Sequence, residues 1–240
     1  MPVRSYYRDA LFLGLKTGAI RVRVSAMLTV TATLDHLCDM KKVGLFFGSF
    51  NPIHVGHLVI AEYMAEFTPL QEIWFVVSPR NPLKKKETLL NETQRISMVR
   101  LAIEYDNRFK ASSVEFDMPR PSYTINTLAH LNEKYPNIEF SLILGFDNLV
   151  TLHKWKNYEV LLDSYKLYVY PRVSSGTEQQ TDLSTHPSVV ITDAPVVELS
   201  STFIRKAISE GKTIKHMVPT QVGDYIREMH FYKKAELPEE

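Results

Sequence analysis

Two histidines, His54 and His57, stand three positions apart where an apolar run gives way to a helical pattern. They lie in residues 48–57, which read GSFNPIHVGH and directly follow the apolar residues 43–47. The first turn of a helix presents unpaired N–H groups and the positive end of the helix dipole, which together attract phosphate. Two imidazoles there add donors that can follow negative charge as it builds on a phosphoryl group. The segment therefore predicts a phosphate site.

Two glycines in this segment support that interpretation. Gly48 and Gly56 carry no Cβ, so backbone or ligand can approach closely at both positions. A helix start with two incidental histidines is one alternative. A metal site is another, but the neighbouring residues offer no third ligand. H-x-G-H alone would be a weak signal, whereas the full segment after an apolar strand is specific.

A second helix start offers hydroxyl and amide groups to an anion. Ser200, Ser201 and Thr202 begin the sequence SSTFIR, and one of the two serines is expected to cap the helix. Arg205 is expected on the first turn, where its guanidinium could fork onto a β- or γ-phosphate. Alone, the segment is best explained as an ordinary serine cap. Together with the histidine segment, it indicates a second phosphate contact.

An acidic residue follows another apolar run. Gly145-Phe146-Asp147 comes directly after the strand expected at residues 140–145. A carboxylate at the end of a strand can bind ribose hydroxyls, and Asp147 could equally be the N-cap of a helix. Both roles are compatible with the sequence.

Basic residues gather in residues 79–86, which read PRNPLKKK. Lys84 could neutralise a phosphate, and Lys85 and Lys86 are weaker candidates. Arg172, in a loop after another expected strand, is weaker still. A lysine cluster on a loop is more often simply solvated, so this loop alone predicts no site.

The elements that must position these residues alternate between strand and helix. This alternation is typical of βαβ units and predicts an α/β fold: a Rossmann-like doubly wound parallel sheet with helices on both faces. Ligands bind such sheets at the carboxyl ends of the strands, near the point where the strand order reverses. The expected strands are residues 43–48, 72–78, 140–145, 166–170 and 188–192. Three helices are expected at residues 57–67, 122–135 and 220–231. Two more are expected from their caps: one begins at a capping box of Asn91 and Gln94, and one runs from Ser200 or Ser201 to near Gly211.

The composition excludes several classes of protein. The 240 residues suffice for one α/β domain, and the net charge of +1 gives no field that would attract nucleic acid or an anionic membrane. The single cysteine, Cys38, excludes a disulfide within the chain and a zinc site built from cysteines. No apolar stretch is long enough to span a bilayer. We expect a cytoplasmic protein without nucleic-acid or membrane partners.

Met40 stands directly before Lys41-Lys42 and the first expected strand. Residues 1–39 are rich in arginine, but they lack the continuous apolar core of a secretory signal. We expect the protein to start at Met40, with residues 1–39 outside the fold, residues 40–232 forming one domain and residues 233–240 forming a polar tail. The N-terminal sequence of the native protein would test this expectation.

The segment at residues 48–57 resembles the G-x-F-D-P-x-H-x-G-H motif of the H-x-G-H nucleotidyltransferase superfamily. Asn51 stands where aspartate is commoner, and we expect it to shape the loop through a bond from its side chain to the backbone. SSTFIR resembles the superfamily's S-S-T-x-I-R motif. The resemblance implies that Gly145 and Asp147 meet the adenosine part of ATP. Residues 81–84 resemble the P-P-H-K loop of one branch, with departures at the first and third positions.

Three further stretches resemble bacterial nicotinate-nucleotide adenylyltransferases. Residues 121–128, PSYTINTL, resemble their S-Y-T-x-x-T-L segment, Trp155 matches the position of their tryptophan, and residues 218–232 resemble their V-P-x-x-V-x-x-Y-I ending. The resemblance covers residues 40–232. It implies transfer of the adenylyl group of ATP, with Mg²⁺, to nicotinate mononucleotide, which gives deamido-NAD and pyrophosphate in NAD biosynthesis.

This resemblance also implies a role for each candidate residue. Catalysis would consist of positioning and charge stabilisation by His54, His57 and Arg205, without a protein nucleophile or a metal site of the chain's own. The ring of Trp155 could stack on the nicotinate ring, and backbone N–H groups near Thr124 and at residues 155–156 could bind its carboxylate. The implied ATP contacts are Gly48, Ser49, Phe50, His54, Gly56, His57, Gly145, Asp147, Ser200, Ser201, Thr202 and Arg205, and the implied nicotinate-mononucleotide contacts are Lys84, Tyr123, Thr124 and Trp155.

Two rival functions remain from the sequence. Within enzymes, the rival is the same transfer to nicotinamide mononucleotide or to phosphopantetheine, against which the matches at Thr124 and Trp155 argue. From another class, the rival is a non-catalytic nucleotide sensor, against which the intact His57 and Arg205 argue. The sequence predicts no oligomeric state.

Overall fold

The computed structural model describes residues 40–79, 89–172 and 181–233. The chain divides into two units, Met1–Met40 and Lys41–Glu240, and the fold below is that of the second unit. In the part of the chain that is described, no helix is long and apolar enough to cross a membrane.

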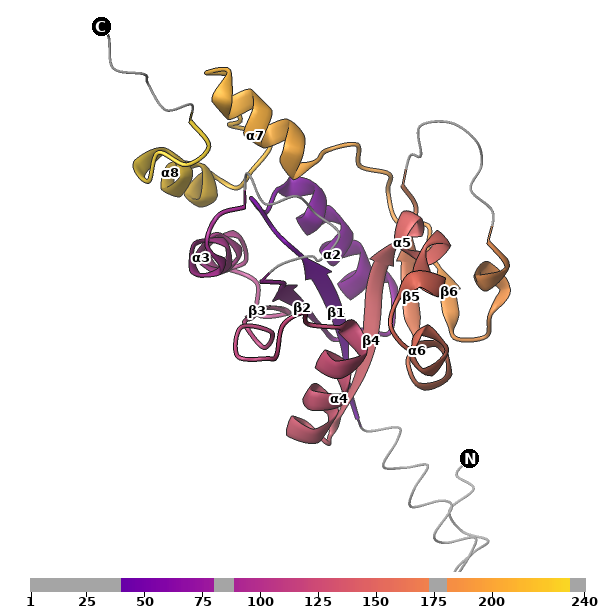
Figure 1. Cartoon of the computed structure of the whole chain (residues 1–240). Coiled ribbons are helices and arrows are strands. Elements are labelled where there is room, and N and C mark those ends of the chain that lie inside the picture. Colours follow the sequence, from indigo (N-terminus) through magenta and orange to yellow (C-terminus); the bar gives the residue numbers. More distant parts are fainter. Residues whose placement is uncertain (1–39, 80–88, 173–180, 234–240) are drawn as a thin grey trace, which may run out of the picture. The chain divides into compact units, whose positions relative to one another are not determined.

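Six parallel strands form one sheet in the order β3-β2-β1-β4-β5-β6 (Figure 1). The chain runs outward from β1 through β2 to β3, and then returns to the other side of β1 with β4. The strand order therefore reverses between β1 and β4. The bounds are β1 Lys41–Gly48, β2 Glu72–Val77, β3 Phe109–Ser112, β4 Ile138–Gly145, β5 Leu167–Tyr170 and β6 Val189–Ile191.

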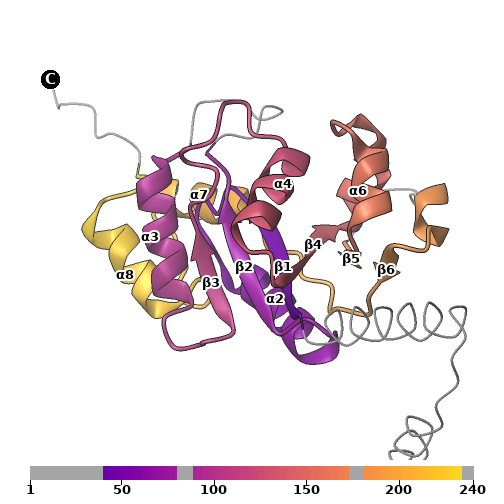
Figure 2. The same ribbon diagram turned by 90° about the horizontal axis from the view of Figure 1, so that it is seen from below.

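Helices cover both faces of the sheet, as the sequence predicts. One buried cluster joins the sheet to α2, α3, α7 and α8, and a second joins its other face to α4, α5 and α6. Figure 2 shows α4 and α6 on the side of the sheet opposite α2. The bounds are α2 Val55–Phe67, α3 Glu92–Ala102, α4 Thr124–Lys134, α5 Phe146–Val150, α6 Tyr158–Ser164, α7 Ser201–Ser209 and α8 Thr220–Glu228, with 3-10 turns η2 Leu152–Lys154 and η3 Asp182–Thr185.

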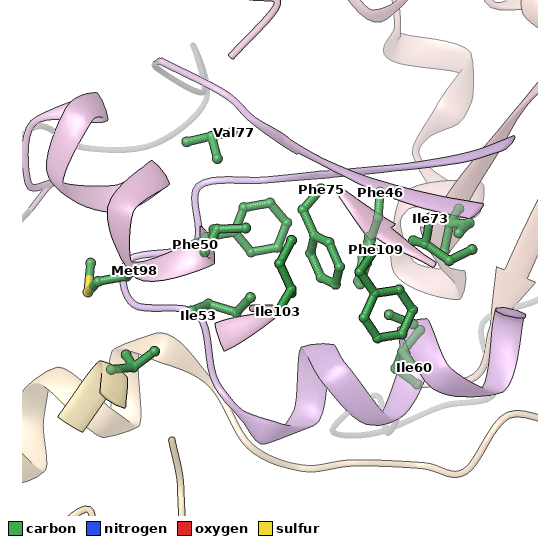
Figure 3. Packing of buried hydrophobic residues seen from close by; sticks show 14 of the residues in the cluster. Phe46, Phe50, Ile53, Ile60, Ile73, Phe75, Val77, Met98, Ile103 and Phe109 are labelled. Carbon is green, nitrogen blue, oxygen red and sulfur yellow. The ribbon is translucent and has the colours of Figure 1, made fainter. Parts of the chain in front are cut away.

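Aromatic side chains fill the core between the sheet and α2. Phe75 lies 5.8 Å from Phe46 and 5.8 Å from Phe109, measured between ring centroids. These three rings come from the three neighbouring strands β1, β2 and β3, and Ile60 of α2 packs in the same cluster (Figure 3). This packing holds α2 against the sheet, with the first turn of α2 close to the end of β1.

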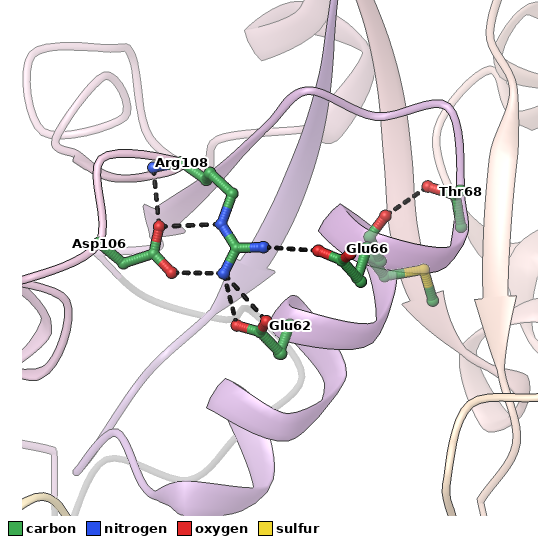
Figure 4. Close-up of polar contacts among 6 residues, drawn as sticks. Glu62, Glu66, Thr68, Asp106 and Arg108 are labelled. Carbon is green, nitrogen blue, oxygen red and sulfur yellow. Dashed lines mark hydrogen bonds and ion pairs between the residues drawn. The ribbon is translucent and has the colours of Figure 1, made fainter.

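β3, α5 and α6 are not among the elements predicted from the sequence. β3 is a four-residue edge strand in which only Phe109 is buried, so it lacks an apolar run. Its position is fixed from outside the strand: Arg108 donates to Asp106, Glu62 and Glu66, the last two on α2 (Figure 4). Contacts of this kind, made between residues far apart in the sequence, leave no local pattern.

The expected helix starts are confirmed at two places. Asn91 Oδ1 accepts the Thr93 N–H at 3.1 Å, and Gln94 Oε1 accepts the Asn91 N–H at 3.2 Å, which completes the predicted capping box. Ser200, not Ser201, caps α7. The last helix is shorter than expected, because it ends at Glu228 and the backbone of His230 is left-handed, with φ 53°.

Candidate active site

The carboxyl ends of three strands bring the predicted segments together. β1 ends at Gly48 and β4 ends at Gly145, and these strands are neighbours at the point where the strand order reverses. Gly145 pairs in register with Tyr170, the last residue of β5, and Arg172 follows two residues later. The histidine segment, Asp147 and Arg172 therefore follow the carboxyl ends of β1, β4 and β5, where such folds bind ligands.

The two histidines open α2. His54 is the N-cap, and the ring centroids of His54 and His57 lie 3.7 Å apart with 31° between their planes. The His54 N–H donates to His57 Nδ1 at 3.2 Å. An Nδ1 that accepts carries no proton, so in the neutral ring the proton of His57 is on Nε2. His57 Nε2–H is thus a hydrogen-bond donor at a helix N-terminus.

His54 is a buried, neutral group. Its exposed fraction is 4%, and in the described part of the chain its Nδ1 has no hydrogen-bond partner. Burial lowers the pKa of His54 to about 4, and the nearby positive charge of Arg172 acts in the same direction. His54 is thus an uncharged imidazole with one unpaired ring nitrogen, and the positive charge of Arg172 lies nearby. Such a site favours binding of an anion, because the anion neutralises the charge of Arg172.

His54 is expected to make stability depend on pH. An unfolded histidine binds a proton below its ordinary pKa of 6.5, whereas folded His54 binds one only near pH 4, so protonation favours unfolding as the pH falls between these values. The displacement corresponds to about 3 kcal/mol of stability, present above pH 6.5 and lost towards pH 4. Urea unfolding would measure the free energy of unfolding at pH 7.0 and at pH 4.5. The decrease between the two pH values should be smaller for His54→Asn than for the wild type. A change at the exposed His130, His130→Asn, should leave the loss unaltered.

Asp147 and Arg172 face each other beside the histidines. Arg172 Nη1 lies 3.3 Å from Asp147 Oδ2, while Asp147 Oδ1 is buried without a partner among the described residues. Gly145, not Asp147, is the N-cap of α5, so that expectation for Asp147 is wrong. A Cβ at Gly145 would lie 2.5 Å from Asp147 Oδ1, so only glycine fits there with this carboxylate orientation.

The space between these groups is small. A cavity of about 20 Å³, lined by His54, His57, Gly56 and Arg172 among others, has room for about one water molecule. A phosphate group would therefore need this space to widen. The sequence ranked Arg172 as its weakest phosphate candidate, and the structure brings it next to the strongest ones.

The first turns of α7 lie against the segment between β1 and α2. Ser201 Oγ donates to the Pro52 carbonyl at 2.8 Å, and Arg205 Nη1 donates to the Asn51 carbonyl at 2.9 Å. Ser200 Oγ accepts the Phe203 N–H at 3.2 Å. Arg205 begins the second turn of α7 rather than lying on its first, since α7 starts at Ser201. The two predicted phosphate segments are thus joined by direct hydrogen bonds.

Asn51 makes a bond from its side chain to the backbone, as expected, but to a remote segment and not within its own loop: Oδ1 accepts the Leu90 N–H at 3.3 Å. Its neighbour Phe50 is 1% exposed, with a left-handed backbone of φ 43°. The Phe50 ring covers Gly48, where a Cβ would lie 2.8 Å from it. Phe50 could therefore meet ATP only through its backbone.

The sequence analysis missed Arg95, which is fully buried in α3. Its guanidinium donates to four backbone carbonyls in three segments, and no carboxylate of the described residues neutralises it at hydrogen-bond distance. A lone arginine beside apolar residues in a helix gives no sequence signal for this role. The accepting groups are the carbonyls of Ser49 at 2.6 Å, Ser78 at 2.8 Å, Pro79 at 3.0 Å and Leu90 at 3.0 Å.

The residues predicted to meet the acceptor lie at the start of α4 and the end of η2. Tyr123 is the N-cap of α4, and Lys156 Nζ lies 4.6 Å from the centre of the Tyr123 ring. Trp155 is half-buried and packs on the same core cluster as α4. The main-chain N–H of Trp155 donates to the Leu152 carbonyl at 2.8 Å, which contradicts its expected role as a donor to a carboxylate, whereas that role of the Lys156 main-chain N–H stays a prediction.

Thr124 and Lys84 are the other two residues predicted to contact nicotinate mononucleotide. Thr124 is the first residue of α4, so its N–H has no partner within the helix and remains a candidate donor. Lys84 falls outside the described residues and stays a prediction.

Comparison with known proteins identifies the family. Residues 45–207 match the family model described as cytidylyltransferase-like. A protein of Flavobacterium johnsoniae named "Probable nicotinate-nucleotide adenylyltransferase" is 58% identical over 193 residues, which cover 80% of this chain and 100% of that protein. The chain belongs to the nicotinate-nucleotide adenylyltransferase family. A family member of the same name from Flavobacterium psychrophilum is 52% identical over 80% of this chain and 100% of its own length.

Solved structures of two complexes share this fold. The nicotinic acid mononucleotide adenylyltransferase of Plasmodium falciparum, complexed with NaAD, matches 80% of this chain and 97% of its own, with a TM-score of 0.65 and 20% sequence identity. The same enzyme complexed with APC matches with a TM-score of 0.63 over the same shares of both chains. The six-stranded parallel sheet with helices on both faces is therefore the fold of nicotinate-nucleotide adenylyltransferases, as predicted.

Proposed function

We propose that this chain transfers the adenylyl group of ATP to nicotinate mononucleotide, giving deamido-NAD and pyrophosphate. The observation that carries the proposal is the close pair of imidazoles, His54 and His57, at the N-terminus of α2, a few residues beyond the end of β1 and beside Arg172. Membership of the nicotinate-nucleotide adenylyltransferase family supports the acceptor. The product belongs to NAD biosynthesis.

The reaction needs no protein nucleophile. The 5′-phosphate of the mononucleotide attacks the α-phosphorus of ATP in line, and pyrophosphate leaves, so the protein contributes position and charge. His57 donates through Nε2–H to an oxygen on which charge develops, and His54 supplies a second nitrogen. Arg205 and Arg172 are two cations at this edge of the sheet, and we assign them to the leaving pyrophosphate and to the triphosphate. Asp147, once released by Arg172, binds the ribose of ATP.

A divalent cation, Mg²⁺, is proposed to accompany ATP. The described residues contain no group of three His, Cys, Asp or Glu side chains that could hold a metal ion. Mg²⁺ usually keeps several waters and binds substrate phosphates, so water and phosphate oxygens together would supply most of its ligands. Bound in this way, the cation neutralises part of the phosphate charge.

Direct transfer can be tested by leaving out the acceptor. With ATP, Mg²⁺ and nicotinate mononucleotide, the protein should form deamido-NAD and pyrophosphate in equal amounts. With ATP and Mg²⁺ alone, it should release no pyrophosphate, because direct transfer uses no nucleophile of the protein. A stoichiometric burst of pyrophosphate without acceptor would contradict direct transfer, and absence of deamido-NAD would contradict the proposed function.

Trp155 is expected to contribute to acceptor binding. If its ring stacks on nicotinate, Trp155→Ala should raise the KM for nicotinate mononucleotide about tenfold and leave the KM for ATP unchanged. Trp155→Phe keeps an aromatic face and should recover most of the loss. Steady-state kinetics with each substrate varied in turn would check this, and equal effects on both KM values would reduce Trp155 to a packing residue.

A further inference from the structure

The chain beyond α8 folds back towards the segment between β1 and α2. His230 and Tyr232 have left-handed backbones, with φ of 53° and 63°. Phe231 between them is buried, and its ring lies 5.5 Å from that of Tyr225 on α8. The left-handed conformation is unfavourable for residues with a Cβ, so the surrounding packing must hold this turn in place.

The turn brings the hydroxyl of Tyr232 to Asn51, which is 181 positions earlier in the chain. Tyr232 Oη donates to Asn51 Oδ1 at 2.8 Å. The same oxygen accepts the Leu90 N–H, and the main-chain carbonyl of Asn51 accepts from Arg205. Asn51 is 3% exposed. It is therefore a buried residue that bonds to three segments: the turn after α8, the residues before α3, and α7.

The carbonyl groups around Asn51 are also held from outside the loop. Arg95 donates to the Ser49 carbonyl and Ser201 donates to the Pro52 carbonyl. In a planar trans peptide the following N–H points away from its carbonyl, so the N–H groups of Phe50 and Ile53 point away from Arg95 and Ser201. These bonds fix the orientation of the two peptide groups, and backbone N–H groups held in fixed directions can bind anions.

We propose that Tyr232 is a positioning residue for the phosphate loop, residues 49–52, and that its hydroxyl holds Asn51 so that the loop is preorganised for ATP. The proposal rests on the proposed function, because it takes this loop to be where ATP phosphates bind. Burial raises the pKa of Tyr232 above its ordinary value, although Arg205 and Arg95 act against this rise. The phenol therefore stays protonated and donates at neutral pH.

Tyr232→Phe tests the proposal because it removes one oxygen and keeps the ring. Loss of one neutral hydrogen bond that orders the loop should raise the KM for ATP about three- to tenfold. The KM for nicotinate mononucleotide should stay at the wild-type value. Tyr225→Phe, at the neighbouring tyrosine that packs on Phe231, is the matched control and should leave both KM values unchanged. The rise in melting temperature that ATP alone produces should be smaller in Tyr232→Phe than in Tyr225→Phe.

The outcomes separate this role from the proposed function. An unchanged KM for ATP in Tyr232→Phe would overturn the role of Tyr232, and so would equal increases in both KM values, since these indicate a merely structural residue. If Tyr232→Phe unfolds at the assay temperature, the rise in melting temperature that ATP produces still tests the proposal. An equal rise in Tyr232→Phe and Tyr225→Phe would overturn the role of Tyr232. A wild-type protein that forms no deamido-NAD would contradict the proposed function, whatever the variant does.

Discussion

His57→Ala is expected to lower kcat about 10²–10³-fold, the usual loss when one donor to a developing negative charge is removed. The physical reason is the tautomer of His57. Its Nδ1 accepts the His54 N–H, so its proton is on Nε2, at the N-terminus of α2. Alanine removes that donor at the point where charge moves from the α-phosphorus to pyrophosphate. Initial rates of pyrophosphate release at saturating substrates would measure the effect.

The fold should survive the substitution of His57. Alanine also removes the side chain that caps the His54 N–H, and loss of such a cap costs about 1 kcal/mol. The melting temperature should therefore fall by only a few degrees, about what that loss implies. His130→Ala, at an exposed histidine of α4, is the control and should retain both rate and stability. A fully active His57→Ala protein would show that His57 takes no part in the chemistry.

Arg95→Met is expected to cause a large loss of stability. The guanidinium of Arg95 satisfies four carbonyls from three segments, and its side chain is fully buried. A buried carbonyl left without a donor costs about 1–3 kcal/mol, and of the four bonds only the one to Pro79 is fully buried, so the substitution should lower the free energy of unfolding by about 2–4 kcal/mol. Urea unfolding followed by circular dichroism would give this value, provided the variant folds well enough to be purified.

Arg100→Met is the matched control for Arg95. Arg100 lies on the same helix but is exposed, so its substitution should change the free energy of unfolding by less than about 0.5 kcal/mol. Similar losses in the two variants would mean that the helix tolerates no loss of arginine, and would remove the special role of the four carbonyls. Insoluble Arg95→Met beside well-folded Arg100→Met would agree with the prediction.

The sequence predicted the parts of the fold that depend on neighbouring residues. Val43–Gly48 reads as a strand because its apolar run can be buried on both faces, and Asn91 with Gln94 reads as a helix start because the two caps lie three residues apart. The same holds for the two candidate phosphate segments. Each lies at a helix start that short-range signals reveal.

The rest of the site depends on contacts between remote segments. Arg95 reaches Ser49 across 46 positions, and Tyr232 reaches Asn51 across 181. Nothing near either residue in the sequence marks these bonds, because the bonds exist only once the sheet has assembled. Arg172 was underrated for the same reason, since its position beside His54 depends on the pairing of β4 with β5.

The choice of acceptor tests the account most directly. Pyrophosphate release should be measured with ATP and Mg²⁺, with nicotinate mononucleotide and nicotinamide mononucleotide compared as acceptors over a range of concentrations. We expect kcat/KM for the acid to exceed that for the amide at least about 100-fold, since a site built to bind a carboxylate leaves its donors unpaired with the neutral amide. Equal values of kcat/KM for the two acceptors would contradict the assignment of nicotinate mononucleotide as the substrate.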